Sequence, residues 1–289
     1  MLASARKGDP CMCPAHGLGD VDKTATSVET NGLGQARGGD IVPCTGGPPD
    51  FIVTGSETVT VNSQPAARMS DKTMHQGIVM LGSGSVMIGG PTVGATLGNP
   101  AANTKECCAL AATRHNKGSS QQGYGNCGVE CWRTVVNRAR AARGERPLTE
   151  DEMLQRAIDL KAAQGPIDDV PNRRTVGSCN APQRVRILAD QGIEASMEYP
   201  RDMAQFVAEG RGVSASVHPY WYWPGGGGAQ PDWNHEVLIT GVEYDENGKV
   251  NAYIINDTGF GQCGLRVSAR DFSYAQPPDF AITVTKAPI

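Results

Sequence analysis

The pattern of hydrophobic and polar positions changes in character near residue 100. Before that point no helical period is found, and short alternating runs are separated by Gly, Pro, Ser and Asn. Alternation over a few residues predicts short antiparallel hairpins. The runs cover residues 52–53, 58–61, 78–80 and 86–88. Residues 55–62 and 82–89 share a Gly-Ser turn followed by an alternating strand, which predicts one hairpin unit used twice.

After about residue 120 the pattern is first helical and then strand-like. A helix that ends before Gly144 is predicted by apolar residues at near-helical spacing, namely Val129, Trp132, Val136 and Ala139. Thr149 and Glu152 form a capping box that opens a second helix, and Pro182 can open a third. A further helix is predicted at residues 202–207, followed by strands at 213–217, 235–242, 250–255 and 281–284. Helices followed by strands predict an α+β domain.

The two patterns predict two domains. A chain of 289 residues exceeds one average domain. Residues 94–120 are rich in Gly, Ala, Asn and Ser, which is typical of linkers. We therefore expect a small all-β domain at residues 1–95, a linker at 96–120 and an α+β domain at 121–289.

Charge and cysteine content narrow the function classes. A net charge of -4 with a pI near 5.8 leaves no basic stripe, which argues against nucleic acid as a partner. No apolar run approaches the ~20 residues that span a bilayer, and the first residues lack the apolar segment of a secretory signal, so export would require another machine. Nine cysteines are an odd number, which favours metal binding and catalysis in a reducing cytosol over a simple disulfide framework. Pairing of Cys107, Cys108, Cys179 or Cys263 stays open.

Cys127 is the candidate nucleophile. It follows a glycine-rich stretch and falls in the first turn of the predicted helix, where unpaired backbone N–H groups favour a thiolate. His235 opens a later apolar strand and can act as the base, and Asp257, just past the next strand, can orient it. His218 is a rival base, but it precedes a proline and no carboxylate follows it at strand spacing.

The order Cys127, His235, Asp257 resembles the papain-like cysteine peptidases, and most closely their C39-like branch. In that family a Gln six residues before the nucleophile completes the oxyanion hole, and Gln121 holds that position. Papain-type enzymes place Trp directly after the nucleophile, which would favour Cys131, but Gly125 lies six residues before Cys131.

Two positions stay open within this resemblance. Papain-type enzymes orient the histidine with Asn and C39-like enzymes with Asp, so Asn256 is an alternative to the favoured Asp257. The segment 218–224, rich in aromatic residues, either lines substrate subsites or only covers an edge of the core.

The resemblance implies a papain-like α+β peptidase domain that cleaves proteins by acyl transfer, with no cofactor for catalysis. The same chemistry serves a cysteine-dependent deamidase or a peptidoglycan hydrolase. A non-enzymatic adaptor is the alternative from another class of function.

The motif Pro65-Ala66-Ala67-Arg68, followed by Met69-Ser70-Asp71, resembles the PAAR-repeat family, and residues 6–9 resemble that family's opening motif. The resemblance implies a small β cone that forms the tip of the type VI secretion spike, held on a trimeric spike protein, with an effector domain fused behind it. It also implies a toxin made in the cytoplasm, secreted by the type VI machine into a competitor bacterium, and neutralised by a cognate immunity protein.

A small β domain gains stability from a structural metal, and Zn2+ bound by Cys and His is the usual choice. Cys13 and His16 have ligand spacing by themselves. The resemblance adds Cys44 and His75 to the set. Family tips usually carry three His and one Cys, whereas this region contains only two His, so an extra Cys would substitute. Cys11 is a rival to Cys13, and a region without metal is the alternative.

Overall fold

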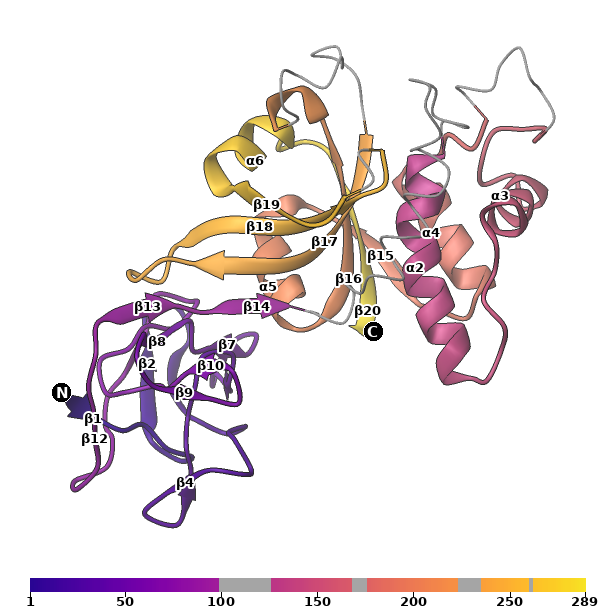
Figure 1. Cartoon of the computed structure of the whole chain (residues 1–289). Helices are drawn as coiled ribbons and strands as arrows, with labels where there is room; N and C mark the ends of the chain where they lie inside the picture. Colours follow the sequence, from indigo (N-terminus) through magenta and orange to yellow (C-terminus); the bar gives the residue numbers. More distant parts are fainter. Residues whose placement is uncertain (99–125, 168–175, 223–234, 260–261) are drawn as a thin grey trace. The chain divides into compact units, whose positions relative to one another are not determined.

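The computed structural model describes residues 1–98, 126–167, 176–222, 235–259 and 262–289. The chain forms two compact units, drawn in Figure 1, and each is described by itself. The first comprises Met1–Leu97 and Val242–Asn251, and the second Gly98–Gly241 and Ala252–Ile289. Gln121, Cys107 and Cys108 lie outside the described residues.

The first unit is built from strands of two to four residues. They are β1 Leu2–Ala3, β2 Pro10–Cys13, β3 Gly17–Asp20, β4 Glu29–Thr30, β5 Leu33–Gly34, β6 Ile41–Val42, β7 Asp50–Phe51, β8 Thr54–Ser56, β9 Thr60–Val61, β10 Gln64–Pro65, β11 Ile78–Val79, β12 Met87–Ile88, β13 Thr92–Gly94 and β14 Thr96–Gly98. They pair antiparallel as β1 with β12, β9 with β10, β8 with β13, β4 with β5, β6 with β7, and β2 between β3 and β11. The predicted all-β character of this region is confirmed.

A tight turn recurs three times in the first unit, at Arg6–Asp9, Arg37–Asp40 and Arg68–Asp71. In each turn the aspartate carboxylate accepts a hydrogen bond from the backbone N–H of the arginine, at 2.7, 2.9 and 2.7 Å. The same carboxylate also pairs with the arginine side chain. The turn is therefore one local device that the sequence uses three times.

The alanines that precede the three turns close a ring of backbone hydrogen bonds. Ala5 N–H donates to Ala67, Ala36 N–H to Ala5 and Ala67 N–H to Ala36, at 3.0, 2.9 and 2.9 Å. All three alanines are fully buried, so the ring lies in the interior. The repeat is threefold, and the predicted unit used twice is corrected. The strands are too short for their alternation to reveal a repeat that the turns and the alanine ring define.

The second unit combines helices with one sheet. The helices are α2 Cys127–Ala142, α3 Glu150–Asp159, α4 Ala181–Asp190, α5 Met203–Ala208 and α6 Ala269–Ala275, with the 3-10 turns η3 Pro200–Asp202 and η4 Pro219–Trp221. The strands are β15 Ala195–Glu198, β16 Arg211–Val217, β17 His235–Tyr244, β18 Val250–Asp257, β19 Gln262–Ser268 and β20 Ile282–Pro288. They lie in the order β15-β20-β16-β17-β18-β19, and the pairs β15 with β20, β20 with β16, β16 with β17 and β18 with β19 are antiparallel. The predicted α+β class is confirmed.

Local sequence signals explain where the helices begin. Helix α2 buries Val129, Trp132 and Val136, which are three of the four apolar positions that predicted it. The capping box of Thr149 and Glu152 opens α3 as expected. Helix α4 begins with a second capping box that the sequence analysis missed, and Figure 1 shows α2, α3 and α4 grouped beside the sheet.

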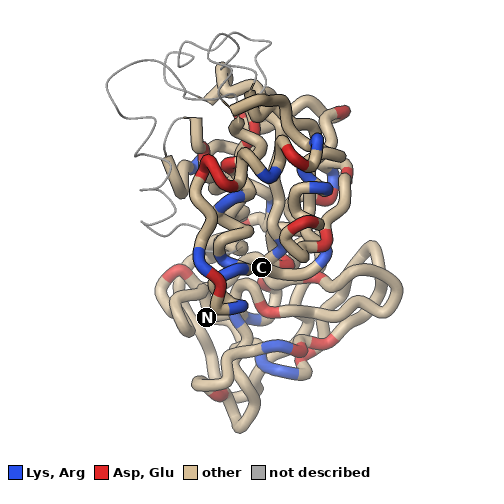
Figure 2. The backbone as a smooth tube through the Cα atoms, turned by 90° about the vertical axis from the view of Figure 1, so that its right-hand side faces the viewer, with Lys and Arg blue, Asp and Glu red and all other residues tan. Residues whose placement is uncertain are grey.

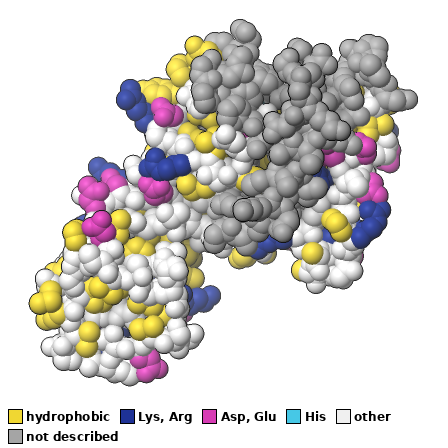
Figure 3. All heavy atoms as spheres, in the orientation of Figure 1, with side chains coloured by type: hydrophobic (Ala, Val, Ile, Leu, Met, Phe, Trp, Pro, Cys, Tyr) yellow, Lys and Arg dark blue, Asp and Glu magenta, His cyan; other side chains and the backbone are white. Residues whose placement is uncertain are grey.

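Two surface properties bear on function. Lys and Arg positions are interspersed with Asp and Glu positions along the tube in Figure 2, in line with the absence of a basic stripe in the sequence. Large apolar side chains are exposed on the first unit, and Figure 3 shows apolar side chains spread over the visible face of that unit.

Among the helices described, none is long and apolar enough to cross a membrane.

Candidate active site and metal site

Cys127 is the first residue of α2. The preceding N-cap residue, Asn126, makes no side-chain capping hydrogen bond, and its amide instead donates to Glu150 Oε1 at 2.9 Å. The Cys127 side chain is half-buried and unpaired with another cysteine. The nucleophile candidate thus lies at the positive end of the helix macrodipole, as the sequence predicts.

His235 and Asp257 meet across neighbouring strands. His235 is the first residue of β17 and Asp257 the last of β18. His235 Nε2 and Asp257 Oδ1 are 2.7 Å apart, and both side chains are buried. Because an ionised carboxylate only accepts hydrogen bonds, Nε2 donates in this contact.

Charges around His235 favour its protonated form. Burial lowers the pKa of the imidazole, but the charge and hydrogen bond of Asp257 and the interaction with Cys127 together raise it well above its ordinary range. An imidazolium beside a thiol favours the thiolate. The structure therefore brings together Cys127, His235 and Asp257.

Asp257 is held by a residue that the sequence analysis did not single out. The Tyr222 hydroxyl donates to Asp257 Oδ2 at 2.8 Å. The neighbouring Asn256 instead accepts a hydrogen bond from the backbone N–H of Gly264 at 3.0 Å. In the described residues it is thus Asp257 that contacts the imidazole. Tyr222 belongs to the aromatic segment 218–224, which was the only signal pointing to it.

The alternative nucleophile, Cys131, and the alternative base, His218, lie in different surroundings from Cys127 and His235. Cys131 lies one turn further along α2, is buried, and burial raises the pKa of its thiol well above the ordinary value. The backbone N–H of His218 donates to Ala275 at 2.6 Å, and its ring packs on Phe280. A small pocket beside Asp257 is lined among others by Thr134, Leu238 and Gln262.

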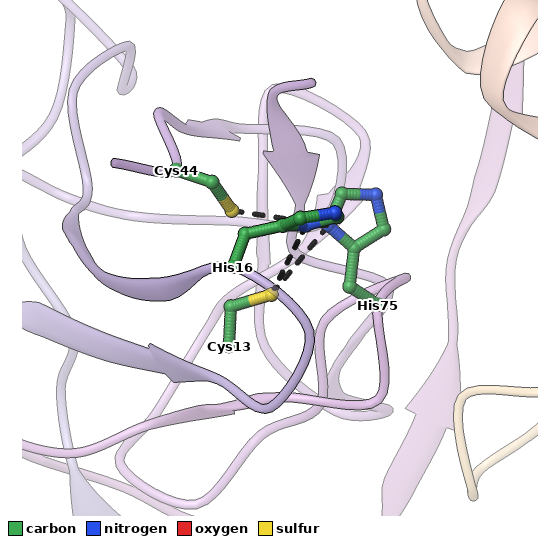
Figure 4. Close-up of side chains that lie close together, drawn as sticks. All are labelled: Cys13, His16, Cys44 and His75. Carbon is green, nitrogen blue, oxygen red and sulfur yellow. Dashed lines mark hydrogen bonds between the residues drawn. The ribbon is translucent and has the colours of Figure 1, made fainter. Parts of the chain in front are cut away.

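The candidate metal ligands converge in the first unit. Cys13, His16, Cys44 and His75 point toward one another in Figure 4, and their ligand atoms all lie within 4.8 Å of one another. Zinc in tetrahedral coordination, with bonds of ~2.3 Å to sulfur and ~2.05 Å to nitrogen, separates two nitrogens by ~3.3 Å and a nitrogen from a sulfur by ~3.6 Å.

Four of the separations between ligand atoms are close to that geometry. His16 Nδ1 and His75 Nδ1 are 3.3 Å apart. Cys13 Sγ lies 3.6 Å from His16 Nδ1 and 3.7 Å from His75 Nδ1. Cys44 Sγ lies 3.8 Å from His75 Nδ1. The cluster can therefore hold a metal ion with two sulfur and two nitrogen ligands.

Neighbouring residues shape this cluster. A Cβ on Gly47 would lie 2.3 Å from His16 Cδ2, so only glycine leaves room for the ring in its present place. Asp50 Oδ1 accepts the backbone N–H of His75 at 3.0 Å, which fixes the loop that carries this ligand. Cys11 lies outside the cluster, in the core, where burial raises the pKa of its thiol to about 12.

The cysteines of the second unit differ in their bonding. Cys263 is disulfide-bonded, whereas Cys127, Cys131 and Cys179 are free. Of the pairings left open by the sequence, a disulfide is therefore present at Cys263 and absent at Cys179. Chemistry that needs a thiol can draw on the three free cysteines found among the described residues of this unit.

Comparisons with known proteins found one family match and similar solved structures. Residues 15–81 match the PAAR motif family, which points to a type VI spike-tip protein. Among solved structures, the chain is similar to a protein from Bacillus anthracis assigned as a C39-like peptidase, with 14% identity, a TM-score of 0.37, and coverage of 57% of this chain and 90% of that one. None of the curated proteins matches the chain. The chain joins a PAAR motif to a mixed α/β region.

Proposed function

We propose that the protein is a type VI secretion effector in which a PAAR spike tip carries a toxic cysteine peptidase. The observation that carries the enzymatic part is the arrangement of Cys127 at the start of α2 beside His235, whose Nε2 lies 2.7 Å from Asp257. Nucleophile, base and orienting carboxylate are the parts that acyl transfer by a thiol needs.

The reaction follows from these positions. The Cys127 thiolate attacks a carbonyl carbon and forms a C–S bond, while the negative charge moves to the carbonyl oxygen. The Cys127 backbone N–H and the Gln121 side chain supply hydrogen bonds to that oxygen. His235 then protonates the leaving amine as the C–N bond breaks, which leaves the acyl group on Cys127. His235 next deprotonates a water molecule, which attacks the acyl carbon, forms a C–O bond and releases the Cys127 thiolate by breaking the C–S bond.

A protein backbone is the proposed substrate of this chemistry. A glutamine side chain or a peptidoglycan cross-link presents the same carbonyl and amine, so deamidation and cell-wall hydrolysis are the alternatives. A spike-tip adaptor without activity is the alternative outside enzymes. In each case the proposed functional domains are residues 1–95 and 121–289, joined by a linker, and residues 242–251 belong to the first compact unit.

Delivery is assigned to the first unit. We assign Zn2+ to Cys13, His16, Cys44 and His75, where it is structural and takes no part in catalysis. The exposed apolar side chains of this unit suit it to dock on a trimeric spike protein. A toxin made in the cytoplasm and secreted into a target cell also requires a cognate immunity protein in the cell that makes it.

Expression of the full chain in bacteria tests the proposal. Toxicity that is lost in Cys127→Ala and His235→Ala, and kept in Cys131→Ala, supports the enzyme. Toxicity that survives both of the first substitutions eliminates this active site. New protein N-termini in intoxicated cells would identify a protease, whereas new glutamates in place of glutamines would identify a deamidase.

Selective alkylation tests the nucleophile without a known substrate. Iodoacetamide should modify Cys127 in the folded chain well before Cys131, because Cys131 is buried and its pKa is raised. Equal rates at the two cysteines, measured by mass spectrometry, would contradict the assignment.

A further inference from the structure

A buried ion pair lies on the far side of the strand that carries His235. Glu236 follows His235 in β17, and because strand side chains alternate it points to the opposite face. Its Oε2 lies 3.2 Å from Arg184 Nη1 of α4, and each side chain is 3% exposed. Nothing in the proposed acyl transfer uses this pair.

Hydroxyl groups extend the pair toward the nucleophile helix. Glu236 Oε1 accepts from Ser214 Oγ at 2.6 Å and Oε2 accepts from Ser216 Oγ at 2.7 Å. The indole N–H of Trp132 in α2 donates to Ser214 Oγ at 3.0 Å. A continuous buried chain of hydrogen bonds therefore joins α2, which begins with Cys127, to β17, which begins with His235.

The guanidinium of Arg184 also packs against the first turn of α2. A Cβ on Gly128, the residue after Cys127, would lie 3.7 Å from Arg184 Nη1 and 2.6 Å from Cys179 Sγ. Arg184 is fixed further by donating Nε to Thr283 Oγ1 at 3.1 Å and Nη1 to the Cys179 carbonyl at 3.3 Å. The absence of a side chain at Gly128 is what allows the close approach of Cys179 Sγ, whereas Arg184 lies at ordinary contact distance.

The positive charge of Arg184 is unusual beside the first turn of a helix. A cation beside a helix N-terminus opposes the macrodipole, and a buried ion pair is weak evidence for stability. An anion in the first turn reverses that balance, because the arginine then adds to the positive field of the helix. Among the described residues, Cys127 interacts with His235 from β17, Arg184 from α4, Cys131 from α2 itself and Cys179 from the segment before α4.

We propose that Arg184 and Glu236 are positioning residues for the nucleophile. Their network holds α2 against β17, so that the Cys127 thiol faces His235, and the charge of Arg184 favours the thiolate. This inference rests on the proposed function only in taking Cys127 as the nucleophile.

The test is the pH dependence of Cys127 alkylation by iodoacetamide in the full chain. The acid limb is the low-pH part of the profile, in which the alkylation rate rises with pH. Arg184→Met should move this acid limb to higher pH, with labelling about threefold to tenfold slower at pH 6. Glu236→Gln should move the limb to lower pH, because the cation remains without its counter-charge. Arg186→Met is the matched control, since Arg186 is an exposed arginine of the same helix, and it should leave the limb in place.

Opposite shifts separate an electrostatic role from a structural one. A purely structural pair would shift the limb in the same direction in both variants, or lower the melting temperature without moving the limb, and either result overturns the inference. If Arg184→Met or Glu236→Gln does not fold, the test uses Arg184→Lys and the double variant Arg184→Met/Glu236→Gln. Neither of these proteins leaves an uncompensated buried charge. Arg184→Lys should keep the acid limb at the pH of the parent protein and lower the plateau rate. The double variant should bring the acid limb back toward the pH of the parent protein. An acid limb displaced in both proteins would overturn the inference.

Alkylation of the parent protein separates a failure of the proposed active site from a failure of the positioning role. A parent in which Cys127 is no more reactive than an ordinary thiol overturns the proposed active site. A reactive parent whose acid limb is unmoved in both Arg184→Met and Glu236→Gln overturns the positioning role alone.

Discussion

The Tyr222 hydroxyl donates a hydrogen bond of 2.8 Å to Asp257 Oδ2, while Oδ1 of the same carboxylate contacts His235. Both oxygens of Asp257 are therefore held. A carboxylate fixed at two points keeps the imidazole in one orientation and one tautomer. Tyr222 thus acts on His235 through Asp257 and is a positioning residue in the proposed site.

Removing that hydroxyl should weaken the site while keeping the fold. A hydrogen bond to a charged group contributes about 1.5–3 kcal/mol, so Tyr222→Phe should slow Cys127 alkylation at neutral pH by at least roughly tenfold. Tyr220→Phe is the control, because Tyr220 lies two residues away and is exposed. Equal rates in both variants and the parent would show that Asp257 does not need this contact.

Metal content should follow the geometry of the four-residue cluster. Cys13→Ser removes a ligand, and Gly47→Ala places a methyl group where the His16 ring lies, so both should reduce bound zinc well below one equivalent and lower the melting temperature. Cys11→Ser should keep its zinc, because Cys11 lies in the core and outside the cluster. Zinc analysis of the purified full chain checks this, and loss of metal in Cys11→Ser alone would reassign the site.

The three arginine turns should differ in their contribution to stability. Arg68 is buried and donates to Asp71, to the carbonyls of Gly55 and Gly90, and to Thr92. Removing one partner of a buried pair costs about 3–5 kcal/mol, so Arg68→Ala should lower the free energy of unfolding by that amount.

Arg6 occupies the equivalent turn but is 19% exposed. Arg6→Ala should therefore cost only about 1 kcal/mol. Urea unfolding of the two variants measures the difference. Equal losses would mean that the ring of alanines, rather than the arginine contacts, determines the stability of the turns.

Asp40 should make stability depend on pH between about 4 and 6. Burial raises the pKa of Asp40 to about 6, and contacts with Arg37 only partly offset it. The folded state then retains a proton that the unfolded chain releases, so the free energy of unfolding falls as pH rises through this window, by at most ~3 kcal/mol.

Asp40→Asn should remove this dependence. The unfolding free energy of the parent minus that of the variant should fall as pH rises from 4 to 6 and then stay level. Urea titrations at several pH values measure that difference, in which acid loss of metal cancels. A constant difference would show that the Arg37 contacts outweigh burial.

Much of the fold was open to prediction because its signals are local. The apolar spacing that marks α2 and the capping box at Thr149 are set by residues within one or two turns of one another. The CxxH spacing of Cys13 and His16 is local in the same sense, whereas Cys44 and His75 entered only through a family resemblance. The roles of Cys127, His235 and Asp257 stay predictions, and Gln121 lies outside the described residues.

The sequence by itself determined an all-β region ahead of an α+β region, and the residue types from which a metal site and a thiol active site can be made. Only the tertiary structure decided that the alanines before the three arginine turns close a ring, and that Cys13 rather than Cys11 joins the metal cluster. It also decided that Tyr222 contacts Asp257 and that Arg184 pairs with Glu236 behind the candidate site. The physical reason is that these contacts join residues far apart in the chain. Their distances depend on how strands and helices pack, which no local spacing specifies.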